Sequence, residues 1–279
     1  MSDNPHAKPA TLLPCCLTVA GSDSGGNAGI QADLRAFHAY GLHGLTAIAA
    51  VTAQNPGSIR GIWPLPAEAV AAQLDAVFAA YGVSAAKTGM LATAAAVAAV
   101  ADCFARHRGI PLVVDPVAIA TTGAELFDDA AIALLKNRLL PLATLATPNL
   151  PEARRLCGHD GAAADLAREL FEEYGCATAV KGGHATGATS IDILCRAGAH
   201  GESVIEEFAL PRIVNPLSTH GTGCSFAAAA AAELARGSTL SDAVHGAKRY
   251  VYEAIVNARQ TTGAAATLGF VRMHPEGLP

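Results

Sequence analysis

The sequence predicts a three-layer α/β/α fold, in which a mostly parallel central sheet carries helices on both faces. Short apolar runs of strand length alternate with longer segments in which apolar residues recur at helical spacing. The 279 residues are 51% hydrophobic and only 15% charged, which suits one large core. Because no repeat or composition break divides the chain, we expect one domain over residues 14–265, a flexible segment at 1–13 and a C-terminal tail at 266–279.

The first half of the chain alternates strands and helices in a regular order. A helix is expected after the first strand because Ile30, Leu34 and Phe37 recur at helical spacing. Pro66 suits the first turn of a second helix, where its missing N–H is not needed. The expected elements are a strand at 17–21, a helix at 28–40, a strand at 45–52, a helix at 66–81, a strand at 85–87, a helix at 93–106 and a strand at 111–115.

The second half continues this alternation and ends in two helices. Pro151 marks a helix start, and the alanine run after Cys224 predicts another helix because alanine is the best helix former. Gly198 and Gly201 mark the turn of a hairpin nearer the sheet edge. The expected elements are a helix at 129–139, a strand at 144–147, a helix from 151, a strand at 178–181, a hairpin of 191–195 with 203–208, and helices at 225–235 and 240–258.

The charge and cysteine content exclude several classes of protein. The net charge is −5 and no basic stripe is present, so we expect no nucleic-acid partner. No run of 18 apolar residues occurs and the N-terminus lacks the basic start of a signal peptide, so we expect no membrane contact. The seven cysteines include no C-x-x-C pair, which fits neither a disulfide framework nor a zinc site. A reduced, cytoplasmic protein is therefore expected.

Unusual polar residues follow the first strands, where the ligands of parallel α/β sheets bind. The loop GSDSGGNAG after the first strand has glycines for close approach, but it matches neither common nucleotide-binding motif. Asp33 lies on or beside the inward stripe of the next helix, either in an ion pair or in contact with a ligand. Gln54 offers both a donor and an acceptor at a strand end, although a simple turn before Pro56 also explains it. Met90 is suited to packing on a ring.

Later strand ends add groups suited to phosphate chemistry. Asn149 and Glu152 flank Pro151, where they either cap a helix or hold a hydrated Mg²⁺ ion. Lys181 ends a strand before two glycines, a place that suits phosphate binding as well as a solvated lysine. Together these loops predict a ligand site along one edge of the sheet.

Cys224 lies in the stretch HGTGCSFAAAAAA, at the start of an expected helix. The small residues Gly221, Thr222 and Gly223 precede it. A helix N-terminus offers unpaired N–H groups to an anion, and it lowers the pKa of a nearby thiol. The alternative is a glycine cap followed by a small buried thiol.

These segments, in this order, resemble the ribokinase-like superfamily and, more closely, its hydroxymethylpyrimidine/phosphomethylpyrimidine kinases of thiamin biosynthesis. The resemblance covers roughly residues 16–258, nearly the whole chain. It rests on the segments LTVAGSDSGGNAGIQADL, VTAQN, AKTGML, VVDPV, TPNLPEA, VKGGH, THGTGC and AKRYVYEAI. It implies a Mg²⁺-dependent transfer of phosphate from ATP to the hydroxymethyl group of 4-amino-5-hydroxymethyl-2-methylpyrimidine, then to the monophosphate. It also implies a homodimer.

The resemblance assigns roles to particular residues. Cys224 matches the catalytic base, a position where most ribokinase-like enzymes have aspartate, and Gly221, Thr222 and Gly223 match the anion hole. Asp33 and Gln54 match pyrimidine-binding residues, in a pocket lined by Gly21, Ala28, Met90 and Val117. Asn149 and Glu152 match the metal motif, and Lys181, Thr222, Gly223 and Lys248 match the ATP side.

Two alternatives remain at this point. A pyridoxal kinase is one, because pyridoxal also carries a hydroxymethyl group on a ring. The other is a ligand-binding relative without activity, because Asn27 places a side chain in the glycine-rich loop where close approach is expected.

Overall fold

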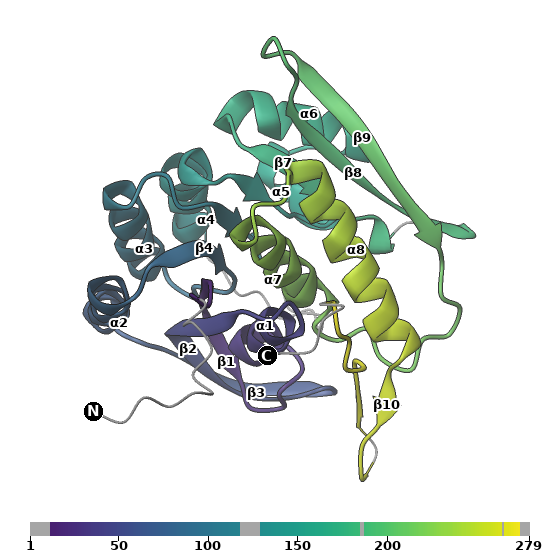
Figure 1. Cartoon of the computed structure of the whole chain (residues 1–279), viewed down its shortest axis with the longest axis horizontal. Helices are drawn as coiled ribbons and strands as arrows, with labels where there is room; N and C mark the ends of the chain where they lie inside the picture. Colours follow the sequence, from purple (N-terminus) through teal and green to yellow (C-terminus); the bar gives the residue numbers. More distant parts are fainter. Residues whose placement is uncertain (1–11, 118–128, 185–186, 264, 274–279) are drawn as a thin grey trace, which may run out of the picture.

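Within the described residues, nine strands form one central sheet in the order β3-β2-β1-β4-β5-β6-β7-β8-β9 (Figure 1). The structure is a computed structural model and describes residues 12–117, 129–184, 187–263 and 265–273. Neighbouring pairs from β2–β1 through β6–β7 are parallel. The β2–β3, β7–β8 and β8–β9 pairs at the two edges are antiparallel. The prediction of a mostly parallel sheet is confirmed.

Each predicted strand is present, usually a few residues longer than expected. The strands are β1 (Cys15–Asp23), β2 (His43–Asn55), β3 (Ser58–Pro64), β4 (Val83–Thr88), β5 (Leu112–Val114), β6 (Leu145–Ala146), β7 (Ala177–Val180), β8 (Thr189–Ala197) and β9 (Ser203–Pro211). The edge strand β3 was not predicted. It pairs with β2 through a tight turn in which Asn55 Oδ1 accepts from the N–H groups of Gly57 and Ser58, at 2.9 and 3.0 Å.

Helices cover both faces of the sheet and complete the three predicted layers (Figure 1). One face packs against α1 (Gly29–Ala39), α7 (Thr222–Ala235) and α8 (Leu240–Val256). The other packs against α2 (Ala67–Ala80), α3 (Ala94–Arg106), α4 (Asp129–Leu134), α5 (Leu150–Cys157) and α6 (Ala163–Tyr174). Helix α4 continues into a π-helical turn over Leu135–Leu139 and a 3-10 turn over Leu140–Leu142, and a further 3-10 turn spans Gly182–His184.

The alanine run lies in the middle of helix α7, which is buried all round. Residues 227–232 are each fully inaccessible to solvent. This helix packs against α1, α8 and strand β4 at once. Small side chains let these neighbours approach the helix axis closely on every side, and a helix that is apolar all round belongs inside a protein. Because the alanine side chains are small, helix α7 can pack close to the sheet, and this packing positions the start of the helix.

The C-terminal segment returns to the domain. Strands β10 (Arg259–Gln260) and β11 (Ala266–Thr267) form a small separate hairpin. Beyond it, Leu268 is buried, and the N–H of Met273 donates to the carbonyl of Ala39 at 3.0 Å. This part of the expected tail thus packs beside α1 and α8, whereas residues 1–11 and 274–279 lie outside the described part of the chain.

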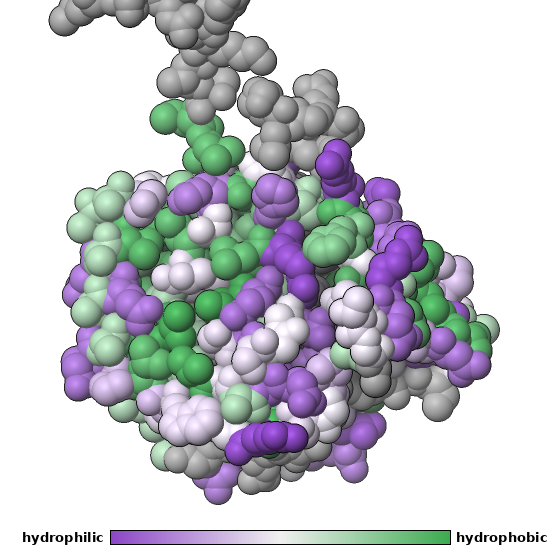
Figure 2. Space-filling model, turned by 90° about the horizontal axis from the view of Figure 1, so that it is seen from below, coloured by the Kyte–Doolittle hydropathy of each residue, from purple (hydrophilic) through white to green (hydrophobic). Residues whose placement is uncertain are grey.

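Polar and apolar residues share the surface. Figure 2 shows hydrophilic and hydrophobic residues interspersed over one face of the molecule. Among the described residues, no helix combines the length and the apolar character needed to cross a membrane.

Candidate active site

A cavity of about 730 Å³ opens at the carboxyl ends of the parallel strands. Its walls come from the loops after β1, β2, β4, β5, β6 and β7 and from the first turn of α7. It brings together every predicted site residue other than Asp33. These are Gly21, Ala28, Gln54, Met90, Val117, Asn149, Glu152, Lys181, Gly221, Thr222, Gly223, Cys224 and Lys248.

The glycine-rich loop after β1 is organised around the carboxylate of Asp23. This carboxylate accepts hydrogen bonds from the N–H groups of Gly25, Asn27 and Ala28, at 2.8 to 3.0 Å. Burial disfavours the charge, but His220 and these N–H groups together hold the pKa of Asp23 below its usual range. Sequence reasoning did not single out Asp23, although an aspartate that opens a glycine-rich loop is a recognisable turn signal.

The loop after β1 touches the turn before α7 at one tight point. Gly221 has φ +85°, and a Cβ placed there would lie 1.8 Å from the carbonyl oxygen of Asn27. Glycine is required at this position by both its conformation and the close approach. Asn27 itself does not adopt a left-handed conformation, and its side chain is not among those that line the cavity. The asparagine is therefore accommodated beside the site rather than inside it.

One side of the cavity, which we call the ring side, is lined by Gly21, Gln54, Met90 and His220, with the Asp23 carboxylate next to His220. A Cβ on Gly21 would lie 2.5 Å from the methyl group of Met90, so glycine leaves the methionine room at the cavity wall. The backbone of Gln54 is tied to the hydroxyl of Ser24 by two hydrogen bonds of 2.8 Å. The Gln54 side-chain nitrogen lies 3.1 Å from Nε2 of His220, a residue that sequence reasoning missed.

Asp33 is buried away from the cavity wall. Lys87 Nζ donates to both of its carboxylate oxygens at 2.8 and 2.9 Å, and the Thr18 hydroxyl donates to one of them at 2.6 Å. Neither Asp33 nor Lys87 is accessible to solvent. Burial raises the pKa of Asp33, whereas the charges of Asp33, Cys224 and Asp115 raise the pKa of Lys87 against the opposing effect of burial. Of the two alternatives for Asp33, the structure shows the ion pair.

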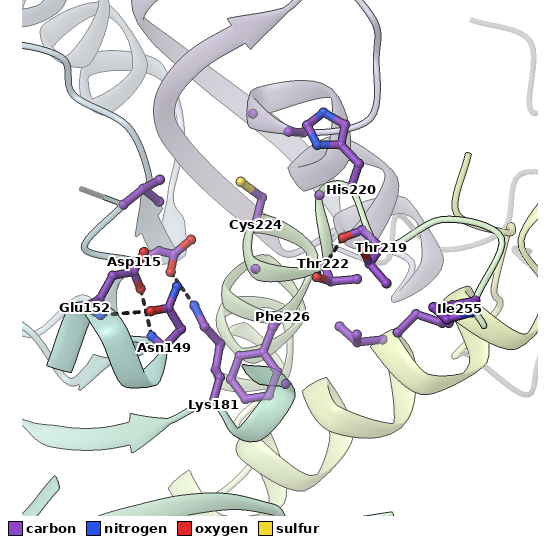
Figure 3. Close-up of a pocket in the computed structure, with 18 of the residues that line it drawn as sticks. Asp115, Asn149, Glu152, Lys181, Thr219, His220, Thr222, Cys224, Phe226 and Ile255 are labelled. Atoms are coloured by element: carbon purple, nitrogen blue, oxygen red, sulfur yellow. Dashed lines mark hydrogen bonds and ion pairs between the residues drawn. The ribbon is translucent and has the colours of Figure 1, made fainter. Parts of the chain in front are cut away.

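Charged groups form the opposite side, which we call the phosphate side: Asp115, Asn149, Glu152 and Lys181 (Figure 3). Lys181 Nζ donates to Asp115 Oδ1 at 2.8 Å, and the Thr147 hydroxyl donates to the same oxygen at 3.2 Å. The second oxygen, Asp115 Oδ2, is buried and has no hydrogen-bond partner in the described part of the chain. An unpartnered buried carboxylate oxygen beside a cavity is a candidate ligand contact. Sequence reasoning quoted the strand that ends at Asp115 but did not select this residue.

Asn149 and Glu152 form a reciprocal cap at the start of α5. The N–H of Glu152 donates to Asn149 Oδ1 at 2.9 Å, and the N–H of Asn149 donates to Glu152 Oε2 at 2.7 Å. Glu152 is nearly buried, and burial, with the charge of Asp115, raises its pKa well above the usual range despite Lys181. Asn149 and Glu152 thus cap the helix, which was one of the two predicted roles, and they also line the cavity.

The oxygen atoms of the phosphate side suit a hard cation. No group of three or more His, Cys, Asp and Glu side chains in the described residues is arranged to hold a metal ion. Mg²⁺ needs no such cage, because it binds through one or two carboxylates and keeps waters or phosphate oxygens as its other ligands. Asp115 Oδ2, which no described residue contacts by a hydrogen bond, and the carboxylate of Glu152 fit this requirement.

Cys224 lies in the first turn of α7, between the two sides of the cavity (Figure 3). The expected lowering of its pKa is not found. Burial raises the pKa of the thiol to about 11, and the charges of Asp33 and Asp115 act in the same direction, against Lys87. The lowering of a thiol pKa expected at a helix N-terminus is outweighed here by burial and by the nearby carboxylates. In this turn the N–H of Thr222 donates to the carbonyl of Thr219 at 3.3 Å, and the N–H of Ser225 donates to the carbonyl of Gly221 at 2.9 Å. The N–H groups of Gly223 and Cys224 lie between them, at the start of the helix, where N–H groups lack a helical partner.

Lys248 reaches the cavity from helix α8. Its Nζ lies 3.0 Å from Asp192 Oδ2, and both side chains are nearly buried. Asp192 Oδ1 also accepts the N–H of Gly182 at 2.7 Å, so one carboxylate ties Lys248 to the loop that follows Lys181.

Fold and site together define a phosphotransferase of the ribokinase-like class. The family model described as phosphomethylpyrimidine kinase matches residues 23–268. The chain belongs to this family.

Curated relatives agree with the family. The chain is 44% identical over 253 residues to the hydroxymethylpyrimidine/phosphomethylpyrimidine kinase of Streptomyces coelicolor, covering 88% of this chain and 90% of that protein. It is 45% identical over 243 residues to the thiamine biosynthesis bifunctional protein of Geobacter sulfurreducens. That match covers 86% of this chain but spans about half (48%) of the bifunctional protein.

Solved structures share the fold. The pyridoxal kinase of Bacillus subtilis, determined as an ADP complex, superimposes with a TM-score of 0.81 and 30% identity. The match covers 94% of this chain and 99% of that one.

Proposed function

We propose that the protein transfers the terminal phosphate of ATP to the hydroxymethyl group of 4-amino-5-hydroxymethyl-2-methylpyrimidine, and then to the monophosphate formed. The observation that carries this proposal is the division of one cavity into a ring side lined by Gln54 and Met90 and a phosphate side rich in charged groups, with Cys224 between them. The name of the Streptomyces coelicolor relative supports the same substrates, and the name of the Geobacter sulfurreducens relative supports a place in thiamine biosynthesis.

On the ring side, Gln54 offers hydrogen bonds to the edge of the heterocycle, and Met90, Gly21, Ala28 and Val117 pack around its faces. Asp33, buried behind this wall in its ion pair with Lys87, supports the ring side without touching the substrate. The ring is thereby placed with its hydroxymethyl group toward Cys224.

On the phosphate side, ATP binds with its phosphates toward the start of α7. The N–H groups of Gly223 and neighbouring residues hold phosphate oxygens, the Thr222 hydroxyl lies beside them, and Lys181 and Lys248 provide positive charge. Magnesium, when bound, offsets phosphate charge. Asp115 and Glu152 would hold it, with Asn149 keeping the Glu152 backbone in place.

Cys224 is placed to take the proton of the substrate hydroxyl. In phosphoryl transfer the hydroxyl proton leaves late, because bonding to the phosphorus is weak in a loose transition state. Because the pKa of Cys224 is raised, the thiol is neutral in most of the resting sites, and only the fraction that has lost its proton to solvent acts as the base. This thiolate accepts the hydroxyl proton as the substrate oxygen bonds to the phosphorus and ADP leaves, which restores the neutral thiol. The Gly221–Gly223 turn meanwhile holds the transferring phosphate.

A pyridoxal kinase is the second candidate function. The specific observation in its favour is the likeness of the fold to the Bacillus subtilis pyridoxal kinase over 94% of the chain. Pyridoxal presents a hydroxymethyl group on a ring of similar size, so the phosphate side serves it equally well. Discrimination between pyridoxal and hydroxymethylpyrimidine therefore depends on the residues of the ring side.

We also infer that the protein works in the cytoplasm as a homodimer, without nucleic-acid or membrane partners. The seven cysteines, which all lie within the described residues, are free thiols, as in a reducing compartment. Light scattering of the purified protein tests the dimer.

The substrate is tested by measuring ATP consumption with Mg²⁺ and three compounds side by side: hydroxymethylpyrimidine, its monophosphate and pyridoxal. The proposal expects turnover with the first two. Turnover with pyridoxal alone would replace the substrate, and binding without turnover of all three would indicate a relative that has lost activity.

A further inference from the structure

His220 lies on the ring side between Gln54 and Asp23, and the proposed reaction gives it no role. Its Nε2 is 3.1 Å from the side-chain nitrogen of Gln54 and 3.6 Å from Asp23 Oδ2. The side chain is only 11% exposed. Figure 3 shows it on the turn before α7, on the other side of Cys224 from Asp115 and Lys181.

Two nitrogen atoms 3.1 Å apart form a hydrogen bond only if one of them accepts. The amide nitrogen of Gln54 carries two hydrogens and cannot accept, whereas a neutral imidazole has one nitrogen with a free lone pair. Nε2 of His220 also lies 3.6 Å from Asp23 Oδ2, so its hydrogen could serve that carboxylate instead. With the amide nitrogen of Gln54 turned toward the imidazole at the shorter distance of 3.1 Å, we infer that Nε2 is the acceptor and that the ring hydrogen lies on Nδ1. One amide hydrogen of Gln54 is used by this bond.

His220 itself is held from two directions. Asp23, next to its ring, is fixed by the N–H groups of Gly25, Asn27 and Ala28. The neighbouring Gly221 is pressed against the Asn27 carbonyl, so the backbone beside His220 has little freedom. The Thr52 hydroxyl donates at 3.0 Å to the carbonyl of Ser22 and makes only a longer contact, of 3.5 Å, with Gln54 Oε1. The imidazole is thus the group that best fixes the amide.

A fixed amide presents its remaining hydrogen and its oxygen in one order. Rotation of the amide by a half turn exchanges the two, and a bare cavity wall would permit either order. An aminopyrimidine edge, with an N–H donor beside a ring nitrogen acceptor, matches one order only. An oxo-pyrimidine edge, with a carbonyl beside a ring N–H, matches the other.

We propose that His220 is a positioning residue that determines substrate specificity, because by accepting one amide hydrogen of Gln54 it fixes the order of acceptor and donor offered to the substrate ring. This inference rests on the proposed function, in which the ring binds at Gln54. The chemical class selected is an amino-substituted nitrogen heterocycle, with the amino group beside a ring nitrogen.

The test compares two substrates on the wild-type protein and on His220→Ala: 4-amino-5-hydroxymethyl-2-methylpyrimidine and its 4-oxo analogue. For the wild type we expect kcat/KM to favour the amino compound by about 100-fold or more, since a mismatched polar group is left unpaired. In His220→Ala this ratio falls at least about tenfold, mainly through a higher KM for the amino compound, with kcat changed by less than about threefold. His159→Ala, at an exposed ion pair with Glu169, is the matched control and leaves the ratio unchanged.

An unchanged ratio in His220→Ala, or a loss of kcat for both substrates alike, would overturn the inference and leave His220 a structural part of the turn. Inactivity of the wild type on both pyrimidines would instead remove the proposed function. If His220→Ala does not fold, nitrogen NMR of labelled histidine in the wild type decides, with His220→Gln used to assign the signal. Hydrogen on Nδ1 supports the inference, and hydrogen on Nε2 contradicts it.

Discussion

The two sides of the cavity are built by different physical means. On the phosphate side, burial raises the pKa of Glu152, and the charges of Asp115 and Glu152 raise the pKa of Lys181 against the opposing effect of its burial. The ring side relies on Gln54 and His220, whose side chains lie 3.1 Å apart, with the backbone of Gln54 tied to Ser24 and the ring of His220 beside Asp23. Buried charges must be paired before a ligand arrives, because an isolated buried charge is costly. Charge can thus recognise any phosphate, whereas discrimination between rings depends on the order of donors and acceptors.

The largest expected effect is at Cys224, where the two sides meet. Cys224→Ala should lower kcat by about 10²- to 10⁴-fold, the usual contribution of a general base, while the dissociation constants of ATP and pyrimidine change little. Steady-state kinetics with calorimetric binding measurements check this. Equal losses in binding and kcat would mean that Cys224 holds the ligands rather than the proton.

The Asp33–Lys87 pair should matter for stability more than any surface pair. Lys87→Met leaves Asp33 buried without its partner and should lower the free energy of unfolding by about 3–5 kcal/mol. The double variant with Asp33→Asn should recover part of this loss. Arg106→Met, which breaks an exposed pair with Asp75, is the control, with an expected cost below about 1 kcal/mol. Denaturant unfolding measures all three, and equal costs at the two sites would contradict the account.

Two glycines at opposite ends of α7 test the contact between the loops. Gly221 and Gly237 have nearly the same φ, +85° and +86°, but only Gly221 would place a Cβ against a neighbour. Gly237→Ala should cost about 1–2 kcal/mol of stability from its left-handed conformation alone, with normal activity. Gly221→Ala should cost more and also reduce kcat/KM. Similar activities for the two variants would show that the Asn27 contact does not shape the site.

The smallest expected effect is the change in kcat/KM for each unit of pH. Because the pKa of Cys224 is raised to about 11, the thiolate fraction, and with it kcat/KM, should rise about tenfold per pH unit in the alkaline range. Cys224→Asp, whose carboxylate is ionised at neutral pH, should flatten this rise. A wild-type rate that is independent of pH over this range would exclude the thiolate as the base.

Local patterns predicted most of the fold. Helices α1, α2, α3 and α8 begin and end within two residues of their predicted bounds, because apolar spacing and Pro66 are local signals. Strand β3 was missed, since Gly61 and Pro64 weaken a strand pattern that an edge position tolerates. Helix α6 was also left unassigned, although Leu166, Leu170 and Tyr174 carry helical spacing.

The site was predicted where a residue acts through its place at a strand end, and missed where a distant partner decides. Asp33 was identified as needing a partner, but Lys87, 54 residues away, could not be inferred from spacing. His220 gained its role from Gln54, separated by 166 residues. The pKa of Cys224 went against the local helix rule because burial and two remote carboxylates outweigh it.

The most direct test of the account is a phosphorus NMR time course of the wild-type protein with ATP, Mg²⁺ and hydroxymethylpyrimidine. If one cavity holds the ring and the phosphates together, ADP and the pyrimidine monophosphate appear first, and the diphosphate follows as the monophosphate is consumed. Release of inorganic phosphate without a phosphorylated pyrimidine would contradict the central claim that the two sides meet at Cys224.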